Sequence, residues 1–567
     1  MAERLGATGA SSLQEILVAQ VNHLPIVAHF ARRLGLVELV NELVPTQMAV
    51  EPGVIALGLV LDTLSGRSPL YHLQTAFEEC DRGLLFGQEL AAEYFSDDHV
   101  GRMLDCFFAA GTQRIFSALS VRALERFALS TEQVHFDTTS VNLFGDYLGA
   151  QEDAAPFKIA QGYSKDKRPD LKQFVLSLLC VDGNVPVFGK IEDGNASDKA
   201  INHRLLSEIS EHMHQYGVES DAFVYIADSA MVTEANLAQL GERTRFISRL
   251  PATYNEHERV ILAAIEADDW QAVGHIAQRA PTKNRPGAFY RLHEGSVTID
   301  GKAYRAVVVH SSAHDRRRLK RLERELEASR TEIVRLAKEA EKQTFFCRAD
   351  AEAAAAQGQT RSTAYHLLEV SVEERPRFAP GRPKKGTPRL PVAVNYVLHP
   401  CITEQPEALA KRRQMAGCFV LLSNVPADSG GAYDAERILR TYKEQHGIEK
   451  NFGFLKDDQI VNALFLKRPE RIEALGLILL ISLLIWRLIE RVMRTELEAR
   501  QATLPGWDNK PTARPTAYMM TWKFRGVLLL CVGGQRQLAK PLTSTQIAFL
   551  CALQVPASCF TQYPKDG

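Results

Sequence analysis

The sequence lacks an excess of charge of either sign. Its 567 residues include 67 basic and 68 acidic side chains, which gives a formal net charge of −1. A strongly basic average is one sign of a nucleic-acid-binding domain, and the chain as a whole does not have it. Any contact with nucleic acid therefore has to come from local clusters of Lys and Arg.

The chain also lacks paired cysteines and an apolar run of membrane-spanning length. Its nine cysteines form no CxxC pair, so neither a disulfide framework nor a zinc module is indicated. The N-terminus has no charged region followed by an apolar core, so it does not predict a signal peptide. The most apolar run, residues 474–486, has 13 residues, whereas a span needs about 20. We expect a cytoplasmic protein without a membrane partner, and a buried core helix at 474–486.

The length favours several domains. At roughly 100–200 residues per domain, the chain predicts about three or four. Hydrophobic residues make up 46% of it and charged residues 24%, an ordinary globular balance with enough apolar material for a large core. We divide it into a helical N-terminal domain (1–130), the first part of an α/β core (131–254), an insertion (255–430), the last helices of the core (431–500) and a C-terminal tail (501–567).

Residues 131–250 read as a mixed α/β segment. Short β-type runs cover 134–141, 171–181 and 185–191, and the Asp-Gly pair between the last two is a strong hairpin signal. A helical pattern at about 198–216, a strand at 221–231, a helix at 231–241 and a strand at 245–250 follow. The order of three strands, helix, strand, helix and strand predicts a mixed sheet with helices on its faces.

Residues 255–430 interrupt this pattern. Strand character appears at 287–292, 297–300, 303–310 and 417–424, and a long helix is expected at about 314–343. Its apolar spacing is compatible with a coiled coil, but we favour a helical hairpin within an insertion. Residues 373–390 are rich in Pro, Gly and basic side chains and predict a linker. Helices are expected again at 434–458 and 469–497.

Two aspartates lie in the predicted sheet. Asp137 stands inside one apolar strand, and Asp228 stands near the end of another. A single strand aspartate is usually a turn or cap residue, but two in adjacent parts of one sheet are harder to explain in that way. Carboxylates are costly to bury unless they are paired or bound to metal. Oxygen ligands of this kind suit Mg²⁺ or Mn²⁺.

A third carboxylate lies in the predicted helix 434–458. Tyr442, Gln445, Glu449 and Lys456 are spaced by three, four and seven residues, which places them on one face of an α-helix. A charge-rich solvated helix would also show such spacing. Gly447 costs the helix about 1 kcal/mol relative to alanine, which is a small local conflict with this prediction.

These segments together resemble a known family, the bacterial insertion-sequence transposases of the DDE type. Within it they resemble the group whose last helix carries a Tyr-x2-Arg-x3-Glu-x6-Lys signature. Tyr442, Gln445, Glu449 and Lys456 match its spacing throughout. Gln445 stands where the signature has arginine, and glutamine lacks the charge and the fork of that side chain. The runs 135–140, 162–179 and 225–233 resemble the subgroup numbered sixteen thirty-four among insertion sequences.

The resemblance implies a fold, an activity and partners. It implies a ribonuclease H-like mixed-sheet core, a large insertion before the last catalytic carboxylate, and cleavage and joining of DNA with Mg²⁺ or Mn²⁺, as two ions. Asp137, Asp228 and Glu449 match the catalytic, metal-binding triad. The implied partners are double-stranded DNA, as inverted-repeat ends and target, and a second copy in a homodimer on DNA. The implied location is the bacterial cytoplasm, associated with the nucleoid.

Several basic or polar side chains are candidates for DNA contact. Residues 158–172 hold five basic and two acidic side chains with interleaved aromatics, and phosphate contact or a solvated loop would both fit. Gly381–Lys385 is similar to the core of a minor-groove AT-hook, although a plain linker also explains it. The helical region 1–130 fits either a DNA-end-binding domain or a scaffold. The candidate DNA-binding residues are Tyr442, Gln445, Lys456, Lys165, Lys167, Arg168, Lys172 and Arg382.

The leading prediction is an active DNA transposase. One alternative is a ribonuclease H-like nuclease that cuts strands without joining them. The other is a catalytically inactive, transposase-derived DNA-binding protein. Retention of all three carboxylates favours an enzyme, and the long insertion with the basic stretch at 162–172 favours the transposase over the nuclease.

Overall fold

The structure, a computed structural model, describes most of the chain. It forms two compact units, which we call unit 1 (residues 1–248 and 441–567) and unit 2 (residues 249–440). The described residues are 16–66, 68–143, 147, 155–214, 217–219, 222–241, 244–276, 287–359, 362–381, 388, 390–427, 433–457, 466, 468–532 and 534–563.

A mixed sheet forms the centre of unit 1. Its order is β4-β3-β2-β5-β6, with β2–β3 and β3–β4 antiparallel and β2–β5 and β5–β6 parallel. Helix α8 follows β4, and helix α9 lies between β5 and β6, so the predicted order of strands and helices is confirmed. The elements are β2 (Gln133–Leu143), β3 (Lys172–Val181), β4 (Val185–Glu192), α8 (Asp198–His214), β5 (Val224–Ala227), α9 (Glu234–Leu240) and β6 (Arg245–Arg249).

The hairpin between β3 and β4 is also confirmed. Asp182, Gly183 and Asn184 have φ values of 31°, 73° and 70°. This left-handed region is open to glycine, and Asn and Asp enter it more readily than other side chains. The Asp-Gly-Asn sequence therefore makes a tight turn that suits the right-handed twist of the two strands.

Helices make up most of the described residues between 16 and 130, after strand β1 (Ile16–Gln20). Helix α3 is apolar all round and every residue from Pro52 to Leu64 is buried, so it is a core helix rather than a surface helix. Helices α1, α2 and α6 pack against it. The helices are α1 (Leu24–Leu34), α2 (Leu36–Leu43), α3 (Pro52–Ser65), α4 (Leu73–Glu78), α5 (Arg82–Phe86), α6 (Asp97–Ala110) and α7 (Thr112–Arg126).

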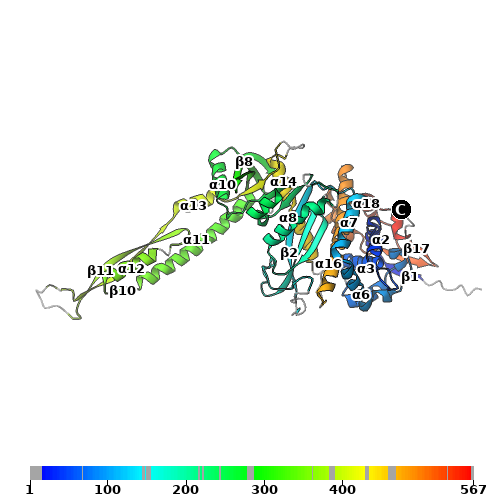
Figure 1. The fold of residues 1–567 in the computed structure, drawn as a ribbon, viewed down its shortest axis with the longest axis horizontal. Helices are drawn as coiled ribbons and strands as arrows, with labels where there is room; N and C mark the ends of the chain where they lie inside the picture. The colour runs from blue at the N-terminus through cyan, green and yellow to red at the C-terminus, as the bar shows by residue number, and fades with distance from the viewer. Residues whose placement is uncertain are drawn as a thin grey trace, which may run out of the picture. The chain divides into compact units, whose positions relative to one another are not determined.

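Helix α16 (Pro469–Ala499) joins this helical layer to the sheet. It packs against α3, α6, α7 and strand β4 (Figure 1). Its length and composition would allow it to cross a membrane, but 83% of its most apolar 18-residue window is buried inside the protein. The run 474–486 is therefore part of a core helix, as predicted.

The C-terminal tail adds small elements around α16. Strand β1 (Ile16–Gln20) pairs antiparallel with β16 (Leu528–Val532), which also pairs with β17 (Gln535–Leu538). The remaining elements are β14 (Leu504–Pro505), β15 (Pro511–Thr512), α17 (Ala517–Lys523) and α18 (Ser544–Leu553).

Unit 2 contains a second sheet segment in the order β13-β9-β8-β7, with α10 packed against it. The two strands predicted at 287–292 and 297–300 are one strand, because β8 pairs continuously with β9 from Tyr290 to Ile299. The elements are α10 (Asn255–Ala267), β7 (Gln271–His275), β8 (Phe289–Ile299), β9 (Lys302–Ser311) and β13 (Cys418–Ser423).

The long helix α11 (Ser312–Glu341) corrects two sequence-based interpretations. Its apolar stripe packs against a ribbon formed by the two long strands of a three-stranded sheet, β11 (His366–Arg377) and β12 (Ala393–Glu404), and against α12 (Arg348–Gln359). In the described part of unit 2 this stripe has a sheet rather than a helix as its main partner, so both the coiled coil and the helical hairpin were wrong. Residues 373–377 of the predicted linker are strand, because β12 pairs with them. Strand β10 (Thr344–Phe345) and helix α13 (Pro406–Met415) complete this part.

Candidate functional site

The strand register of the central sheet brings two of the predicted catalytic carboxylates together. His135 of β2 pairs with Ile226 of β5. Asp137 lies two residues after His135 in β2, and Asp228 lies two residues after Ile226, just past the end of β5. Neighbouring strands are about 4.8 Å apart and side chains repeat every two residues, so these two aspartates stand side by side on one face. The chain continues from β2 to β3 on one side of the β2–β5 pair, and from β5 to β6 on the other side. The two aspartates therefore flank the point where the strand order reverses. Ligands of open α/β sheets bind at such a point.

Lys165 lies against these carboxylates. Its Nζ donates to the Thr138 carbonyl oxygen at 2.6 Å and to Thr138 Oγ1 at 2.7 Å. The same ammonium is 3.3 Å from Asp198 Oδ2 and 3.9 Å from Asp137 Oδ1. Thr138 Oγ1 in turn donates to Asp198 Oδ1 at 2.5 Å. The side chain predicted to contact phosphate is thus turned into the carboxylate group.

The protonation of the two aspartates reflects this crowded setting. Burial raises the pKa of Asp137 to about 7, and the nearby Lys165 ammonium opposes this rise. The Asp228 and Asp198 carboxylates raise the pKa of Asp137 further, since like charges disfavour ionisation. Burial also raises the pKa of Asp228, while a hydrogen bond from the Ala230 amide, 3.0 Å away, opposes the rise. A second cation in this place would favour the ionised form of both aspartates.

The helix predicted at 434–458 is divided into two helices, α14 (Ala435–Glu444) and α15 (His446–Leu455). Gln445 lies at the division, and its Nε2 donates to the carbonyl oxygen of Phe136 at 3.3 Å. The residue that replaces the arginine of the signature therefore holds α15 against β2, next to Asp137.

Gly447 has a packing role on α15. A Cβ atom at this position would lie 1.8 Å from Asn184 Nδ2, in the β3–β4 turn. Asn451, one turn further along, donates to the Asn184 carbonyl oxygen at 2.9 Å and accepts from Arg487 Nε at 2.5 Å. Close approach of the helix to the hairpin thus explains the glycine that conflicted with the helix prediction.

Glu449 lies on this docked helix and pairs with a neighbour on the helix rather than with the aspartates. Its side chain is 64% exposed, and one of its carboxylate oxygens is 2.5 Å from His446 Nδ1. Within the described parts of the chain, no group of three or more His, Cys, Asp or Glu side chains is arranged to hold a metal ion. The structure brings Asp137 and Asp228 together and leaves Glu449 outside that pair.

The other residues of the signature occupy different settings. Tyr442 is half-buried on α14. Lys456 follows the last residue of α15, and its Nζ donates to both carboxylate oxygens of Asp166, at 2.8 and 2.7 Å. This ion pair links the end of α15 to the loop that carries Lys165.

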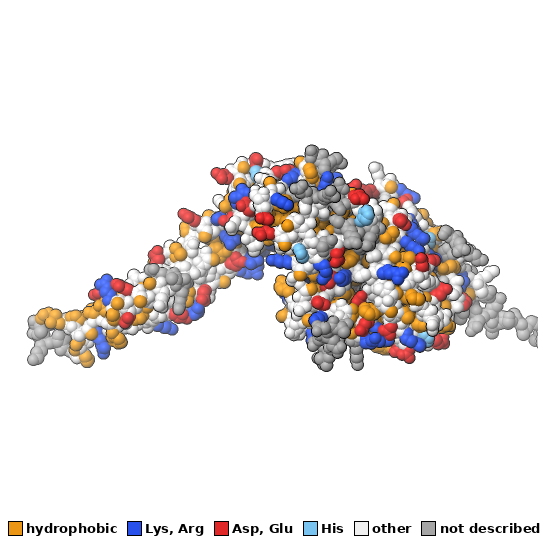
Figure 2. All heavy atoms as spheres, in the orientation of Figure 1, with side chains coloured by type: hydrophobic (Ala, Val, Ile, Leu, Met, Phe, Trp, Pro, Cys, Tyr) orange, Lys and Arg blue, Asp and Glu red, His pale blue; other side chains and the backbone are white. Residues whose placement is uncertain are grey.

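The remaining basic candidates spread over the surface. Lys167 is exposed with a φ of 60°, Arg168 pairs with Asp170 at 2.7 Å, and Lys172 begins strand β3. Arg382 lies outside the described residues. On the face drawn in Figure 2, basic and acidic side chains are interspersed rather than separated, in keeping with the neutral net charge.

The donor set fits a divalent cation in part. Asp137 and Asp228 offer carboxylate oxygens, which Mg²⁺ and Mn²⁺ prefer. Lys165 already shows that a cation is stabilised beside them, by a carbonyl, a hydroxyl and the Asp198 carboxylate. Glu449 would complete the set only after leaving His446.

Two residues of this site were not predicted from the sequence, Asp198 and Thr138. Asp198 is the first residue of α8, and an acidic residue in a first turn is ordinarily explained by the helix dipole. Thr138 stands in a run of buried polar residues in β2, 138–140, which gives no sign of which hydroxyl faces the site. The sequence offered one sign of this role for Asp198. It stands at the start of α8, in the connection from β4 to β5, the strand that precedes Asp228.

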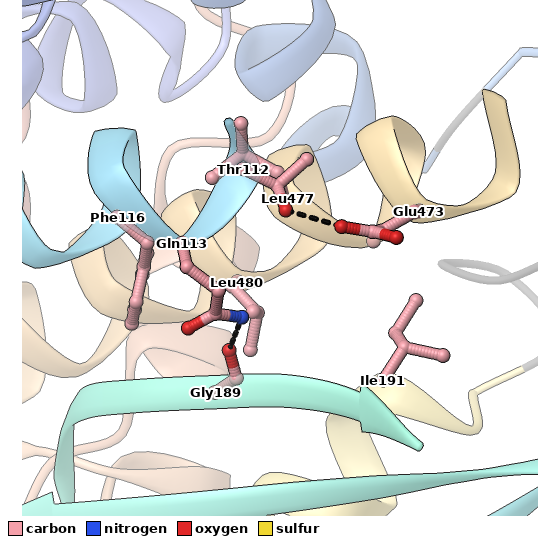
Figure 3. A pocket seen from close by; sticks show the side chains of 9 residues that line it. Thr112, Gln113, Phe116, Gly189, Ile191, Glu473, Leu477 and Leu480 are labelled. Carbon is pink, nitrogen blue, oxygen red and sulfur yellow. Dashed lines mark hydrogen bonds between the residues drawn. The ribbon is translucent and has the colours of Figure 1, made fainter. Parts of the chain in front are cut away.

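The cavity in Figure 3 is a separate, structural feature. It has a volume of only about 10 Å³ and lies between α7, β4 and α16, which is room for about one water molecule. Thr112 Oγ1 donates to Glu473 at 2.5 Å, and Gln113 Nε2 donates to the Gly189 carbonyl oxygen at 2.6 Å. These bonds hold the helical layer against the sheet.

One comparison with known families gives a result. A family model described as a domain of unknown function (DUF4277) matches residues 16–121, from strand β1 into helix α7. This domain is found in transposase-like proteins. The match does not reach Asp137, Asp228 or Glu449. None of the curated proteins compared with the chain matches it significantly.

Proposed function

We propose that the protein is a DNA transposase of the DDE type that cleaves the ends of its own element and joins them to target DNA. The observation that carries this proposal is the proximity of Asp137 and Asp228, which follow the paired residues His135 and Ile226 and interact electrostatically. The domain matched at 16–121 supports it independently, since that domain is found in transposase-like proteins.

The finer class follows the resemblance. A ribonuclease H-like core is proposed for residues 131–254 and 431–500. Support comes from the mixed sheet, which combines three antiparallel strands with a parallel half that carries both aspartates. Membership of the subgroup numbered sixteen thirty-four is proposed from the Tyr442, Gln445, Glu449 and Lys456 spacing. The proposed partners are double-stranded DNA and a second copy of the chain, in the bacterial cytoplasm.

In the proposed mechanism, Asp137 and Asp228 would hold Mg²⁺ or Mn²⁺, and Glu449 of α15 would supply a further carboxylate ligand. Bound metal would activate the attacking hydroxyl or water and stabilise the leaving oxygen of a phosphodiester. Gln445 positions Glu449 by fixing the start of α15 on β2. Without bound metal, the Lys165 ammonium balances the negative charge of the aspartates, and Asp198 and Thr138 hold this ammonium in place.

The experiment that tests this function is cleavage and strand transfer by the purified full-length chain. The substrate is a plasmid that carries the DNA flanking the reading frame, with Mg²⁺, Mn²⁺ or EDTA. We expect metal-dependent cuts at the element ends and transfer of a pre-cut end into a second plasmid. Cleavage without transfer would indicate a nuclease, and neither activity together with tight end binding would indicate a DNA-binding protein.

The second candidate is the catalytically inactive DNA-binding protein. The observation that favours it is the outward position of Glu449, which is 64% exposed and paired with His446. A metal titration followed by tryptophan fluorescence separates the two candidates. The active enzyme responds to Mg²⁺ and loses that response on Asp137→Asn, whereas the inactive protein shows none.

A further inference from the structure

An exposed cluster of aromatic side chains lies in the C-terminal tail of unit 1. Trp507, Tyr518 and Trp522 are 40%, 57% and 50% exposed. The ring centroid of Trp507 is 5.9 Å from that of Tyr518 and 6.2 Å from that of Trp522. Large aromatic side chains are usually buried for most of their area, so three exposed rings in contact need an explanation. We call these three residues the aromatic platform.

The platform is built on rigid supports. Tyr518 and Trp522 are four residues apart on α17 and share its outer face, while Met519 and Met520 are buried on its inner face. The Ala517 amide donates to Glu490 of α16 at 3.1 Å. The rings are therefore fixed to the core helix of unit 1 and are not part of a loose tail.

Trp507 reaches the platform from a tight turn between β14 and β15. Asp508 and Asn509 have φ values of 53° and 56°, a left-handed conformation that Asp and Asn adopt more readily than other side chains. The Lys510 amide donates to the Trp507 carbonyl oxygen at 3.0 Å, and Lys523 Nζ donates to Asn509 Oδ1 at 3.0 Å. The turn and the helix are thus bonded to each other next to the rings.

Basic side chains accompany the platform. The segment 504–528 contains four basic residues and one acidic residue, Asp508. The guanidinium of Arg525 lies over the Trp522 ring, 4.7 Å from its centroid. Asp508 is 3.9 Å from Lys510, and both side chains are more than four-fifths exposed, so water screens this pair. The basic residues are Lys510, Arg514, Lys523 and Arg525.

We propose that the aromatic platform binds unpaired DNA bases by stacking, with the basic residues contacting the phosphates of the same strand. Rings that accept stacked bases, combined with Lys and Arg that follow the backbone, are the physical requirements for binding a single strand. A purely apolar protein partner would gain nothing from the positive charge. The proposal rests on the proposed function for the choice of DNA, and it adds a site for strands that are open near a cut end.

The test measures binding of the full-length chain to fluorescein-labelled oligonucleotides in EDTA, so that no cleavage occurs. One probe is a 15-nucleotide single strand and the other is a blunt duplex of the same sequence. The Trp507→Ala/Trp522→Ala variant is expected to lose about tenfold or more in affinity for the single strand and about twofold or less for the duplex. Trp522→Phe should keep most of the affinity, because it keeps a ring.

Phe346→Ala is the matched control, since Phe346 of unit 2 is an exposed aromatic side chain (80%) outside the platform. It should leave both affinities unchanged. Unchanged single-strand affinity in the double tryptophan variant would overturn the proposal, and so would an equal loss for the duplex. A change of oligomeric state in size-exclusion chromatography would assign the platform to a protein contact instead and overturn it too.

A second variant keeps the test decisive if the tryptophan changes unfold the protein. Lys510→Gln/Arg525→Gln should weaken single-strand binding and make its salt dependence shallower by about 0.7 per lost phosphate contact. An unchanged salt slope would overturn the proposal. Failure here is distinct from failure of the proposed function, because Asp137→Asn should bind the single strand like the wild type while abolishing cleavage.

Discussion

The two regions that supply the predicted carboxylates are built in different ways. Asp137 lies in strand β2, and Asp228 directly follows the adjacent strand β5, where its carbonyl oxygen accepts a hydrogen bond from Ser248 Oγ. Glu449 lies on helix α15, where its side chain is 64% exposed and pairs with His446. The backbone of the sheet therefore fixes the two aspartates, whereas the position of the Glu449 carboxylate depends on its side-chain rotamer. The proposed metal site would thus be completed only when the ion binds.

The largest effect is expected from removing the carboxylates themselves. Asp137→Asn, Asp228→Asn and Glu449→Gln should each lower the rate of metal-dependent DNA cleavage by about 10³-fold or more, because several kcal/mol of transition-state stabilisation depend on the metal. End binding should survive in all three. The measurement is plasmid cleavage beside an electrophoretic binding assay.

Glu332→Gln is the control for this series, because Glu332 is an exposed carboxylate of α11 that pairs with Arg335. It should cleave like the wild type. Glu449→Gln could also cleave normally while the two aspartate variants do not. That result would show that cleavage depends on Asp137 and Asp228 and that Glu449 is not part of the site.

A pH series sharpens the contrast, because burial raises the pKa of both Asp137 and Asp228. The pKa of Asp137 is raised from 3.8 to about 7. Between about pH 4 and pH 7 the folded state therefore binds more protons at this residue than the unfolded state, and its contribution to the free energy of unfolding falls as the pH rises. The Tm of Asp137→Asn should exceed that of the wild type by more at pH 8 than at pH 5.

Metal binding should follow the same titration. Mg²⁺ requires the ionised carboxylate, so the increase in Tm caused by Mg²⁺ should grow from pH 6 to pH 8 in the wild type. The Asp137→Asn variant should show no such growth. A metal-induced shift of equal size at every pH would show that Asp137 does not bind the ion.

Two glycines of α15 test how the helix is placed beside the strands. Gly447→Ala puts a Cβ atom 1.8 Å from Asn184 Nδ2, and we expect a loss of about 1–3 kcal/mol in the free energy of unfolding. A Cβ atom added at Gly453 of the same helix would have no neighbouring atom within 4 Å. Gly453→Ala should therefore stabilise the protein by about 0.5–1 kcal/mol. Urea unfolding of both variants measures the difference, and equal effects would contradict the close approach to the hairpin.

A modest loss of stability is expected at Lys165. Lys165→Met removes the ammonium from Asp137 and Asp198 and should lower the free energy of unfolding by about 1 kcal/mol without metal, a modest value because the lysine side chain is 30% exposed. Mg²⁺ should restore more stability to this variant than to the wild type. Lys167→Met, on the exposed part of the same loop, is the control. Identical behaviour of the two variants would show that Lys165 does not stabilise the carboxylates.

The fold was predictable where local signals agree. The Asp182-Gly183-Asn184 turn and the strands beside it combine turn chemistry with β-type runs, so the hairpin was predicted correctly. The ribbon in unit 2 was missed, because residues 373–377 look like a linker and become a strand only by pairing with 393–397. The stripe on α11 likewise showed that the helix has a partner without showing that the partner is a sheet.

The site was predictable in identity more than in arrangement. The spacing of Tyr442, Gln445, Glu449 and Lys456 indicated one helical face, but it could not show that the helix divides at Gln445. That division depends on a bond to the Phe136 carbonyl oxygen, more than 300 residues away in the sequence. Asp198 was missed for the same reason, since only the folded chain brings it to Lys165.

The pairing of β1 with β16 has a consequence for how the protein is made. Ile16 of β1 pairs with Val532 of β16. During synthesis, β1 therefore cannot pair with β16 until 516 further residues have been translated. At about 5–20 residues per second, this takes roughly half a minute to two minutes. During that interval an unpaired strand edge is open to other chains. We therefore expect slow translation of the last hundred codons to lower the yield of native protein.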